Sequence, residues 1–150
     1  MKKISLFCIF AVAFLFANSQ VLKPVSWSYS AKKTGTGEYE LHLTAAISAG
    51  WHIYSQTTPE GGPFPTAVSF SKNPLVIFQA GISENGKMEQ RHEPLFGVDV
   101  KQFSGKVDFV QKIKLKGKAK TSVLGSIEFM VCNDTQCLPP SQEKFSISLK

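Results

Sequence analysis

Apolar and polar residues alternate along much of the 150-residue chain with a period of two. The clearest segment is 39–45, where Tyr39, Leu41, Leu43 and Ala45 alternate with polar side chains. This pattern is typical of a β-strand with one buried face. Similar short runs predict further strands at Ser26–Ser30, Trp51–Ser55, Ala67–Ser71, Leu75–Phe78, Val98–Phe103, Val107–Leu115, Ser122–Val131 and Lys144–Leu149.

Turn-forming residues separate these runs, and no segment carries an amphipathic helical repeat longer than a turn or two. Glycine and proline interrupt strands because glycine reaches positive φ and proline donates no backbone hydrogen bond. Many short strands at this spacing predict an all-β, antiparallel sandwich in one domain. The predicted turns are Gly35–Gly37, Pro59–Pro63, Asn73–Pro74, Asn85–Gly86, Ser104–Gly105 and Gly117.

The first residues carry the features of a secretory signal peptide. Two lysines precede the apolar run Ile4–Phe16, which is too short to span a bilayer. Ala17 and Ser19 then place small residues three and one positions before a cleavage site at Gln20. We therefore expect residues 1–19 to be removed, and the domain 20–150 to be periplasmic or otherwise exported.

The remaining chain has the length of one domain, enough to bury a core without the help of disulfides. Its formal charge falls from +6 to about +4 when Lys2 and Lys3 are removed with the signal peptide. This mild positive charge does not indicate nucleic-acid binding. No further apolar stretch reaches membrane-spanning length, so we expect no stable membrane insertion after cleavage.

Lysines recur at every second position near the end of one predicted strand, at Lys112, Lys114, Lys116, Lys118 and Lys120. On a β-strand such a ladder forms a solvated face, and lysines on an exposed edge discourage sheet-to-sheet association. We predict that the apolar residues of this strand point inward, namely Val107, Phe109, Ile113 and Leu115.

Two cysteines, Cys132 and Cys137, remain once the signal segment with Cys8 is removed. A pair of this kind persists as a disulfide in an oxidising exported compartment. The cysteines flank a polar turn, 133–136, and the stiff segment 138–140 follows them. A bridge across so short a loop stabilises the fold by only about 2 kcal/mol in the chain-entropy model. The pair is therefore either a local staple or a redox device that a partner thiol can reach.

A zinc site has less support, because the two cysteines and the scattered His42, His52 and His92 lack a recognisable ligand spacing. His42 belongs to the polar side of the alternating strand 39–45, so we expect it to face solvent.

Three stretches, taken in order, resemble the N-terminal periplasmic domain of the transmembrane disulfide reductase DsbD. Ala49–Ser55 is similar to the family's Gly-aromatic-x-x-Tyr strand. Glu93–Gly97 is similar to the loop that caps the family's active site. Phe129–Pro140 is similar to its cysteine hairpin, including the trailing prolines, and the match spans essentially the whole chain after the signal peptide.

This resemblance implies an immunoglobulin-like β-sandwich with the cysteine pair on a hairpin. It also implies that Cys137 forms the mixed disulfide with partners and that Cys132 resolves it. The cap loop around Leu95 and Phe96 would shield the pair and open when a partner docks.

Two further residues would line the site by the same resemblance. Glu93 would lie near the sulfurs, where a carboxylate raises the pKa of a thiol by disfavouring the thiolate. Tyr54 would line the site from its strand. On the sequence alone, Tyr54 and Phe96 are equally well explained as core aromatics, and Glu93 as a solvated acid.

The chain also departs from the family's pattern. Four residues separate the cysteines, where the best-known members have five. Leu95 occupies a usually aromatic cap position, and His52 adds a titratable imidazole whose role is open. The chain is expected to hold one domain only, so electrons must come from another protein.

The sequence thus predicts a thiol–disulfide exchange module. A thioredoxin-fold donor would reduce the Cys132–Cys137 pair, and the dithiol would reduce an oxidised exported protein without any cofactor. The alternative is a non-catalytic secreted β-sandwich whose disulfide pins a recognition loop. A third possibility is a chaperone-like or metal-handling accessory of exported apoproteins.

Overall fold

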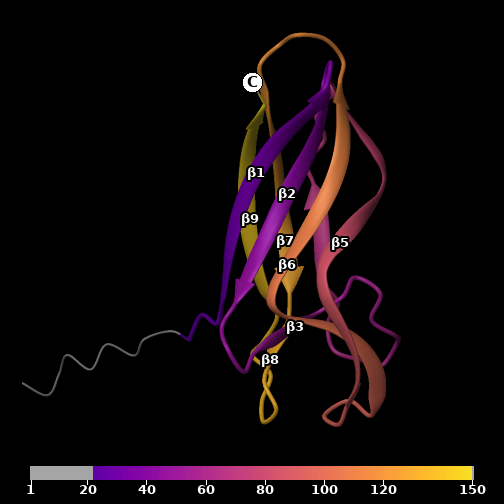
Figure 1. The fold of residues 1–150 in the computed structure, drawn as a ribbon, viewed down its shortest axis with the longest axis vertical. Helices are drawn as coiled ribbons and strands as arrows, with labels where there is room; N and C mark the ends of the chain where they lie inside the picture. Colours follow the sequence, from indigo (N-terminus) through magenta and orange to yellow (C-terminus); the bar gives the residue numbers. More distant parts are fainter. Residues whose placement is uncertain (1–21, 150) are drawn as a thin grey trace, which may run out of the picture.

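The computed structural model describes residues 22–149, so the predicted signal peptide and Cys8 lie outside the described residues. Two antiparallel β-sheets pack face to face, as Figure 1 shows, and no helix occurs between residues 22 and 149. The larger sheet joins β1 (Val25–Gly35), β2 (Glu38–Ile47), β6 (Val98–Leu115), β3 (His52–Tyr54) and β8 (Val131–Cys132), with β5 (Val76–Glu93) paired to β6. The smaller sheet contains β4 (Ala67–Phe70), β7 (Thr121–Phe129) and β9 (Ser141–Leu149). The predicted all-β antiparallel sandwich is confirmed.

The core lies between the two sheets and follows the period-two pattern of the sequence. In β2, the alternating residues Leu41, Leu43 and Ala45 are fully buried, as the pattern predicted. They pack against buried side chains of the smaller sheet, because alternate residues of each strand face the space between the sheets. The buried residues of β7 and β9 are Val123, Ile127, Phe129, Phe145, Ile147 and Leu149.

Two of the predicted turns are wrong, because β5 and β6 are long, continuous strands. The expected turns at Asn85–Gly86 and Ser104–Gly105 lie inside β5 and β6, which pair with each other almost throughout. The chain reverses instead at residues 94–97, where the backbone N–H groups of Phe96 and Gly97 donate to the Glu93 carbonyl. The strands predicted at Leu75–Phe78, Val98–Phe103 and Val107–Leu115 are therefore parts of one long hairpin.

Glycines in these strands bend the hairpin rather than reverse it. Gly105 has a φ of 71° and lies where β6 changes its neighbour, since Ser104 pairs with β3 and Lys106 pairs with β2. Opposite this irregularity, a Cβ on Gly86 would lie 3.0 Å from the Lys106 carbonyl oxygen. The absence of a side chain at Gly86 therefore lets the two strands approach closely where the register shifts.

The predicted strand Ser122–Val131 is divided between the two sheets. β7 ends at Phe129 and pairs with β4 and β9, whereas β8 begins at Val131 and pairs with β3. The chain crosses from the smaller sheet to the larger one at Met130. This crossing carries the cysteine hairpin to the lower end of the larger sheet in Figure 1, where the β5–β6 turn also lies.

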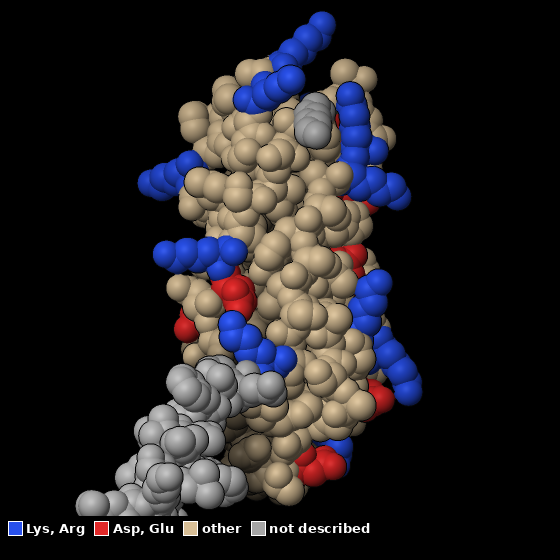
Figure 2. Space-filling view, turned by 90° about the vertical axis from the view of Figure 1, so that its left-hand side faces the viewer, with Lys and Arg blue, Asp and Glu red and all other residues tan. Residues whose placement is uncertain are grey.

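The lysine ladder is exposed as predicted, although it does not lie on a sheet edge. β6 is paired on both sides, and Lys112 and Lys114 project from its outer face toward Glu40 and Glu38 of β2, with N–O distances of 3.9 Å. The three later lysines follow the end of β6 at Leu115. On the face drawn in Figure 2, lysines and arginines are spread out and do not gather in one patch.

His42 lies on the outer face of β2, as its place in the pattern predicted. Its side chain is only 24% exposed, however, because Nδ1 lies 2.7 Å from Oδ2 of Asp108 on the neighbouring β6. The inward residues of β6 also follow the prediction: Val107, Phe109 and Ile113 are fully buried and Leu115 is half-buried.

We predict that Gly125→Ala destabilises the protein by about 1–3 kcal/mol, the usual cost of overpacking a core. Gly125 lies in the central strand of the smaller sheet, and a Cβ there would clash with the Phe145 ring and the Ser69 carbonyl oxygen. Urea unfolding of the purified variant measures the change.

Gly35→Ala is the matched control. Gly35 also lies in a strand, but its new Cβ would meet only the flexible side chain of Glu38. We expect its free energy of unfolding to change by less than about 1 kcal/mol. Equal losses in the two variants would contradict the close packing at Gly125.

Candidate redox site

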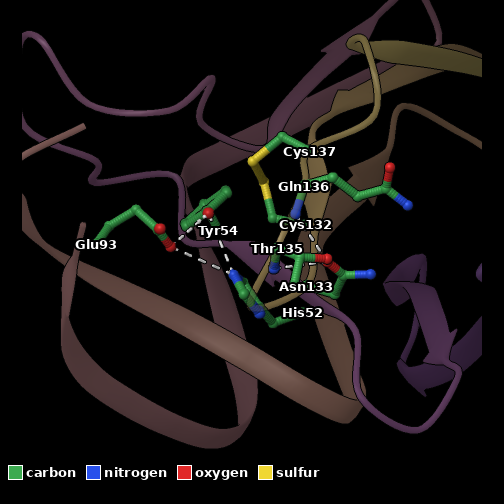
Figure 3. Close-up of a disulfide and its surroundings, with 8 residues drawn as sticks. All are labelled: His52, Tyr54, Glu93, Cys132, Asn133, Thr135, Gln136 and Cys137. Atoms are coloured by element: carbon green, nitrogen blue, oxygen red, sulfur yellow. Dashed lines mark hydrogen bonds and ion pairs between the residues drawn. A yellow bond between two sulfur atoms is a disulfide. The ribbon is translucent and has the colours of Figure 1, made fainter. Parts of the chain in front are cut away.

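The cysteine pair lies on a tight hairpin built by its own backbone and by one asparagine. Cys132 and Cys137 are bridged by a disulfide with a Cα–Cα distance of 4.0 Å, and they form an antiparallel bridge pair. The Asn133 N–H donates to the Gln136 carbonyl at 2.9 Å. The Asn133 side-chain oxygen accepts from the backbone N–H groups of Thr135 and Gln136, both at 2.9 Å. These bonds hold the turn closed independently of the sulfurs (Figure 3).

The two sulfur-bearing residues differ in exposure. Cys132 is completely buried, whereas Cys137 is only half-buried. Apolar side chains surround the pair, with Tyr54, Val98, Val100 and Met130 packed in the same cluster. An approaching molecule therefore reaches the bridge from the side of Cys137.

Strand β3 supports the hairpin and decides which side chains face the sulfurs. His52 pairs with Cys132, and Ile53 pairs with Val131. Directly opposed residues in an antiparallel pair project to the same face of the sheet, and neighbours along a strand project to opposite faces. His52 and Tyr54 therefore share the face of Cys132, while Ile53 and Val131 point into the main core.

The end of β3 is fixed by hydrogen bonds from the segments that follow it. Thr66 donates its hydroxyl to the Tyr54 carbonyl at 2.5 Å, and Glu84 of β5 accepts from the Ser55 hydroxyl and the Gln56 N–H, both at 2.7 Å. These bonds fix the backbone at the end of β3, from which the Tyr54 side chain packs into the cluster around the disulfide.

A buried polar cluster of three residues lies next to the cysteine pair. The Tyr54 hydroxyl donates to Oε2 of Glu93 at 2.9 Å and lies 3.1 Å from Nε2 of His52. His52 Nε2 and Glu93 Oε2 are 3.5 Å apart. The exposed fractions of His52, Tyr54 and Glu93 are 5%, 0% and 6%, so this cluster is almost closed to water.

Burial controls the protonation of two members of this cluster. Burial lowers the pKa of His52 below its ordinary value, and the nearby Glu93 carboxylate opposes that shift. Burial, helped by the hydrogen bond to Glu93, raises the pKa of Tyr54 well above its ordinary value. At neutral pH the imidazole is therefore neutral and the Tyr54 hydroxyl keeps its proton.

The predicted site residues differ in how closely they approach the cysteine pair. Tyr54 packs against the cysteine pair, and the Glu93 carboxylate ends on Tyr54 and His52 (Figure 3). Phe96 is half-buried in the β5–β6 turn, and Leu95 is 53% exposed. Neither belongs to the apolar cluster around Cys132.

Sequence reasoning missed two connections. It left the role of His52 open, because a strand of three residues is too short for its pattern to show which face is buried. It also missed the ion pair between Arg91 of β5 and Asp134 at the hairpin tip, with a distance of 3.2 Å between Nη2 and Oδ1. Exposed ion pairs between distant segments leave no pattern in the sequence.

Between residues 22 and 149, no group of three or more His, Cys, Asp and Glu side chains is arranged to hold a metal ion. No helix in this range is long and apolar enough to cross a membrane.

Several solved structures have a fold similar to that of this chain, three of which follow. The reduced N-terminal domain of DsbD from Neisseria meningitidis matches with a TM-score of 0.60 and 15% identity, over 88% of this chain and 92% of that one. The N-terminal periplasmic domain of ScsB from Proteus mirabilis matches with a TM-score of 0.54 and 15% identity, over 86% of this chain but only 49% of that one. A complex between the DsbD and PilB N-terminal domains of N. meningitidis matches with a TM-score of 0.54 and 13% identity, over 87% of this chain and 88% of the matched chain. These similarities confirm the predicted immunoglobulin-like sandwich.

A search of curated proteins found no matching sequence. The family model for the N-terminal region of the thiol:disulfide interchange protein DsbD, in contrast, matches residues 18–149. That range contains the cysteine hairpin, β3 and the whole sandwich. This chain therefore belongs to the family of DsbD N-terminal domains.

Proposed function

We propose that this chain carries electrons between exported proteins by thiol–disulfide exchange at Cys132 and Cys137. The observation that carries the proposal is the unequal burial of the bridged cysteines on an accessible hairpin, in a chain of the DsbD N-terminal family. A structural staple needs no exposed sulfur, whereas exchange needs one sulfur that a partner can attack in line.

The proposed roles of the two cysteines follow from their exposure. In the dithiol form, the half-buried Cys137 attacks a disulfide of the oxidised partner as a thiolate, and one partner sulfur leaves as a thiol. The buried Cys132 then attacks the Cys137 sulfur of the mixed disulfide, which restores the internal bridge and releases the second partner thiol. Two electrons pass from the dithiol to the partner disulfide, so cysteine chemistry needs no cofactor.

The proposed partners are thioredoxin-fold redox proteins, which serve as electron donor and as acceptor. Support for a protein partner comes from the solved complex of the DsbD and PilB N-terminal domains. Support for an exported location comes from the predicted signal peptide and from the periplasmic ScsB domain of similar fold. We place the protein in the periplasm or an equivalent oxidising compartment.

The β5–β6 turn is the proposed cap of the site. Leu95 and Phe96 belong to this turn, which the Glu93 carbonyl closes by accepting two backbone hydrogen bonds. The 53% exposure of Leu95 leaves its side chain available to a docking partner. We propose that the turn moves when a partner binds and thereby uncovers more of the Cys137 sulfur.

The roles of the cysteines are tested by reacting reduced protein with glutathione disulfide and weighing the products by mass spectrometry. We expect the wild type to finish as an internal disulfide without an adduct, and Cys132→Ser to keep one stable glutathione on Cys137. Cys137→Ser should react at least about tenfold more slowly, because its remaining thiol is buried. Equal rates in the two variants would show that the assigned order is wrong.

The reduction potential of the pair separates an electron carrier from a staple. We expect a value above about −300 mV, the range of exchange proteins, in graded glutathione buffers read by the mass shift on alkylation. A much lower value, or thiols that react only after unfolding, would leave a non-catalytic binding module with a structural disulfide.

Glu93 is predicted to disfavour the thiolate form of the reduced pair by its negative charge. Glu93→Gln should therefore accelerate alkylation of Cys137 at pH 7 by about threefold to tenfold. Glu89→Gln is the matched control, because Glu89 lies on the same strand but is 43% exposed and faces Lys87 at 3.4 Å. The same acceleration in both variants would remove the specific role of Glu93.

A further inference from the structure

His52 is a buried titratable residue that the exchange steps described above do not use. It belongs to β3 and pairs directly with Cys132 of β8, so the two side chains leave the sheet on the same face. Cβ atoms of directly opposed residues lie about 4.5–5.5 Å apart. The imidazole is therefore the neighbouring side chain of the resolving cysteine across the strand pair (Figure 3).

The resolving step has a difficulty that burial creates. Cys132 must lose a proton before its sulfur can attack, because the thiolate is the nucleophile in exchange. The residue is completely buried, so water has little direct access to that proton. A base inside the protein would remove this obstacle.

The hydrogen bonds of the polar cluster show which nitrogen of His52 is basic. The Tyr54 hydroxyl has one proton and donates it to Oε2 of Glu93. Nε2 of His52, at 3.1 Å from the same hydroxyl oxygen, must then be the donor in that contact. Nδ1 is left without a proton and is free to accept one.

Charged groups from several elements face the imidazole. Burial lowers the pKa of His52; Glu93 of β5 and Asp134 of the cysteine hairpin oppose this shift, and Arg91 of β5 adds to it. On β6 the residue opposite His52 is the uncharged Ser104. The neutral imidazole at pH 7 can thus accept a proton, and Glu93, 3.5 Å away, stabilises the imidazolium that results.

We propose that His52 is the proton acceptor for Cys132 in the resolving step. This inference rests on the proposed exchange function and adds a residue to it. The S–H bond of Cys132 breaks and its proton goes to the neutral imidazole of the neighbouring His52. The Cys132 sulfur bonds to the Cys137 sulfur, and the bond between Cys137 and the partner breaks with its electron pair on the partner sulfur. The imidazolium then returns the proton to the departing thiolate or to solvent.

Glu93 is less suited to accept the proton itself. An imidazole is ordinarily a stronger base than a carboxylate, because the pKa of its conjugate acid is higher by about two units. Oε2 of Glu93, the oxygen that lies 3.5 Å from His52, also already accepts the Tyr54 hydroxyl proton. Glu93 therefore acts on His52 as a counter-charge, which is a positioning role.

The test resolves the two chemical steps with 4,4′-dithiodipyridine, an aromatic disulfide that releases one coloured thiopyridone per step. Stopped-flow mixing with the reduced protein gives a first phase for attack by Cys137 and a second phase for resolution by Cys132. His52→Gln places an uncharged amide near Nε2, and His52→Asn places one near Nδ1. Neither variant can take up a proton.

We expect the second phase at pH 7 to slow by about 100-fold or more in both variants, the lower end of the range for a general base. The first phase should change by less than about threefold. His42→Gln is the matched control, since His42 also faces a carboxylate, Asp108, but lies on β2. Its two phases should match those of the wild type.

The pH dependence of the wild type provides a second readout that needs no variant. Only the neutral imidazole accepts a proton, so the second phase should slow as the pH falls through the pKa of His52. The midpoint of this decline should coincide with the NMR titration midpoint of the His52 ring in the wild type.

The outcomes distinguish the role of His52 from the exchange function on which it rests. A second phase that keeps its rate and pH profile in His52→Gln and His52→Asn overturns the role of His52 and leaves exchange intact. A wild-type rate profile without a decline at the His52 midpoint does the same, even if neither variant folds. A wild type without any second phase overturns the exchange function itself.

Discussion

Three residues of backbone, His52–Tyr54, connect the cysteine hairpin to the long sheet. β3 pairs with β6 on one side and with β8 on the other. Because side chains alternate along a strand, this pairing also sorts residues between two environments. Ile53 enters the main hydrophobic core, and its two neighbours face the sulfurs. The position of the redox site therefore depends on a strand that could not be stable on its own and is held by its neighbours and by hydrogen bonds at its end.

The polar cluster beside the disulfide illustrates how a β-sandwich tolerates titratable groups near its core. A buried carboxylate without partners would be costly, but Glu93 accepts a hydrogen bond from Tyr54 and lies close to His52. The same bonds join the last residue of β5 to β3. The β5–β6 turn starts at the residue after Glu93. The Glu93 side chain therefore links the start of this turn to β3, and the exposed Arg91–Asp134 ion pair links the end of β5 to the tip of the cysteine hairpin.

Much of this arrangement could be predicted from the sequence where local patterns decide the outcome. The alternation in β2 showed its buried face, and the spacing of Cys132 and Cys137 indicated a hairpin. The Asn85–Gly86 and Ser104–Gly105 turns were wrong because the same residue types also serve at strand irregularities, where a partner strand decides whether the chain bends or reverses. The division of β7 from β8 and the cluster around His52 depend on which sheet a strand joins. Contacts between residues far apart in the chain determine which sheet a strand joins, so a local sequence pattern cannot predict it.

The backbone hydrogen bonds of the cysteine hairpin have a consequence for the proposed exchange cycle. Two backbone hydrogen bonds close this hairpin without involving sulfur: the Asn133 N–H donates to the Gln136 carbonyl, and the Leu138 N–H donates to the Val131 carbonyl. The loop that the disulfide closes is also short. Opening the bridge would therefore release little chain entropy, and we expect the reduced protein to keep almost the same shape as the oxidised one. The proposed electron donor and electron acceptor would then meet nearly identical surfaces. In the proposed cycle, the redox state of the sulfurs and not refolding of the protein would then decide which partner departs after exchange.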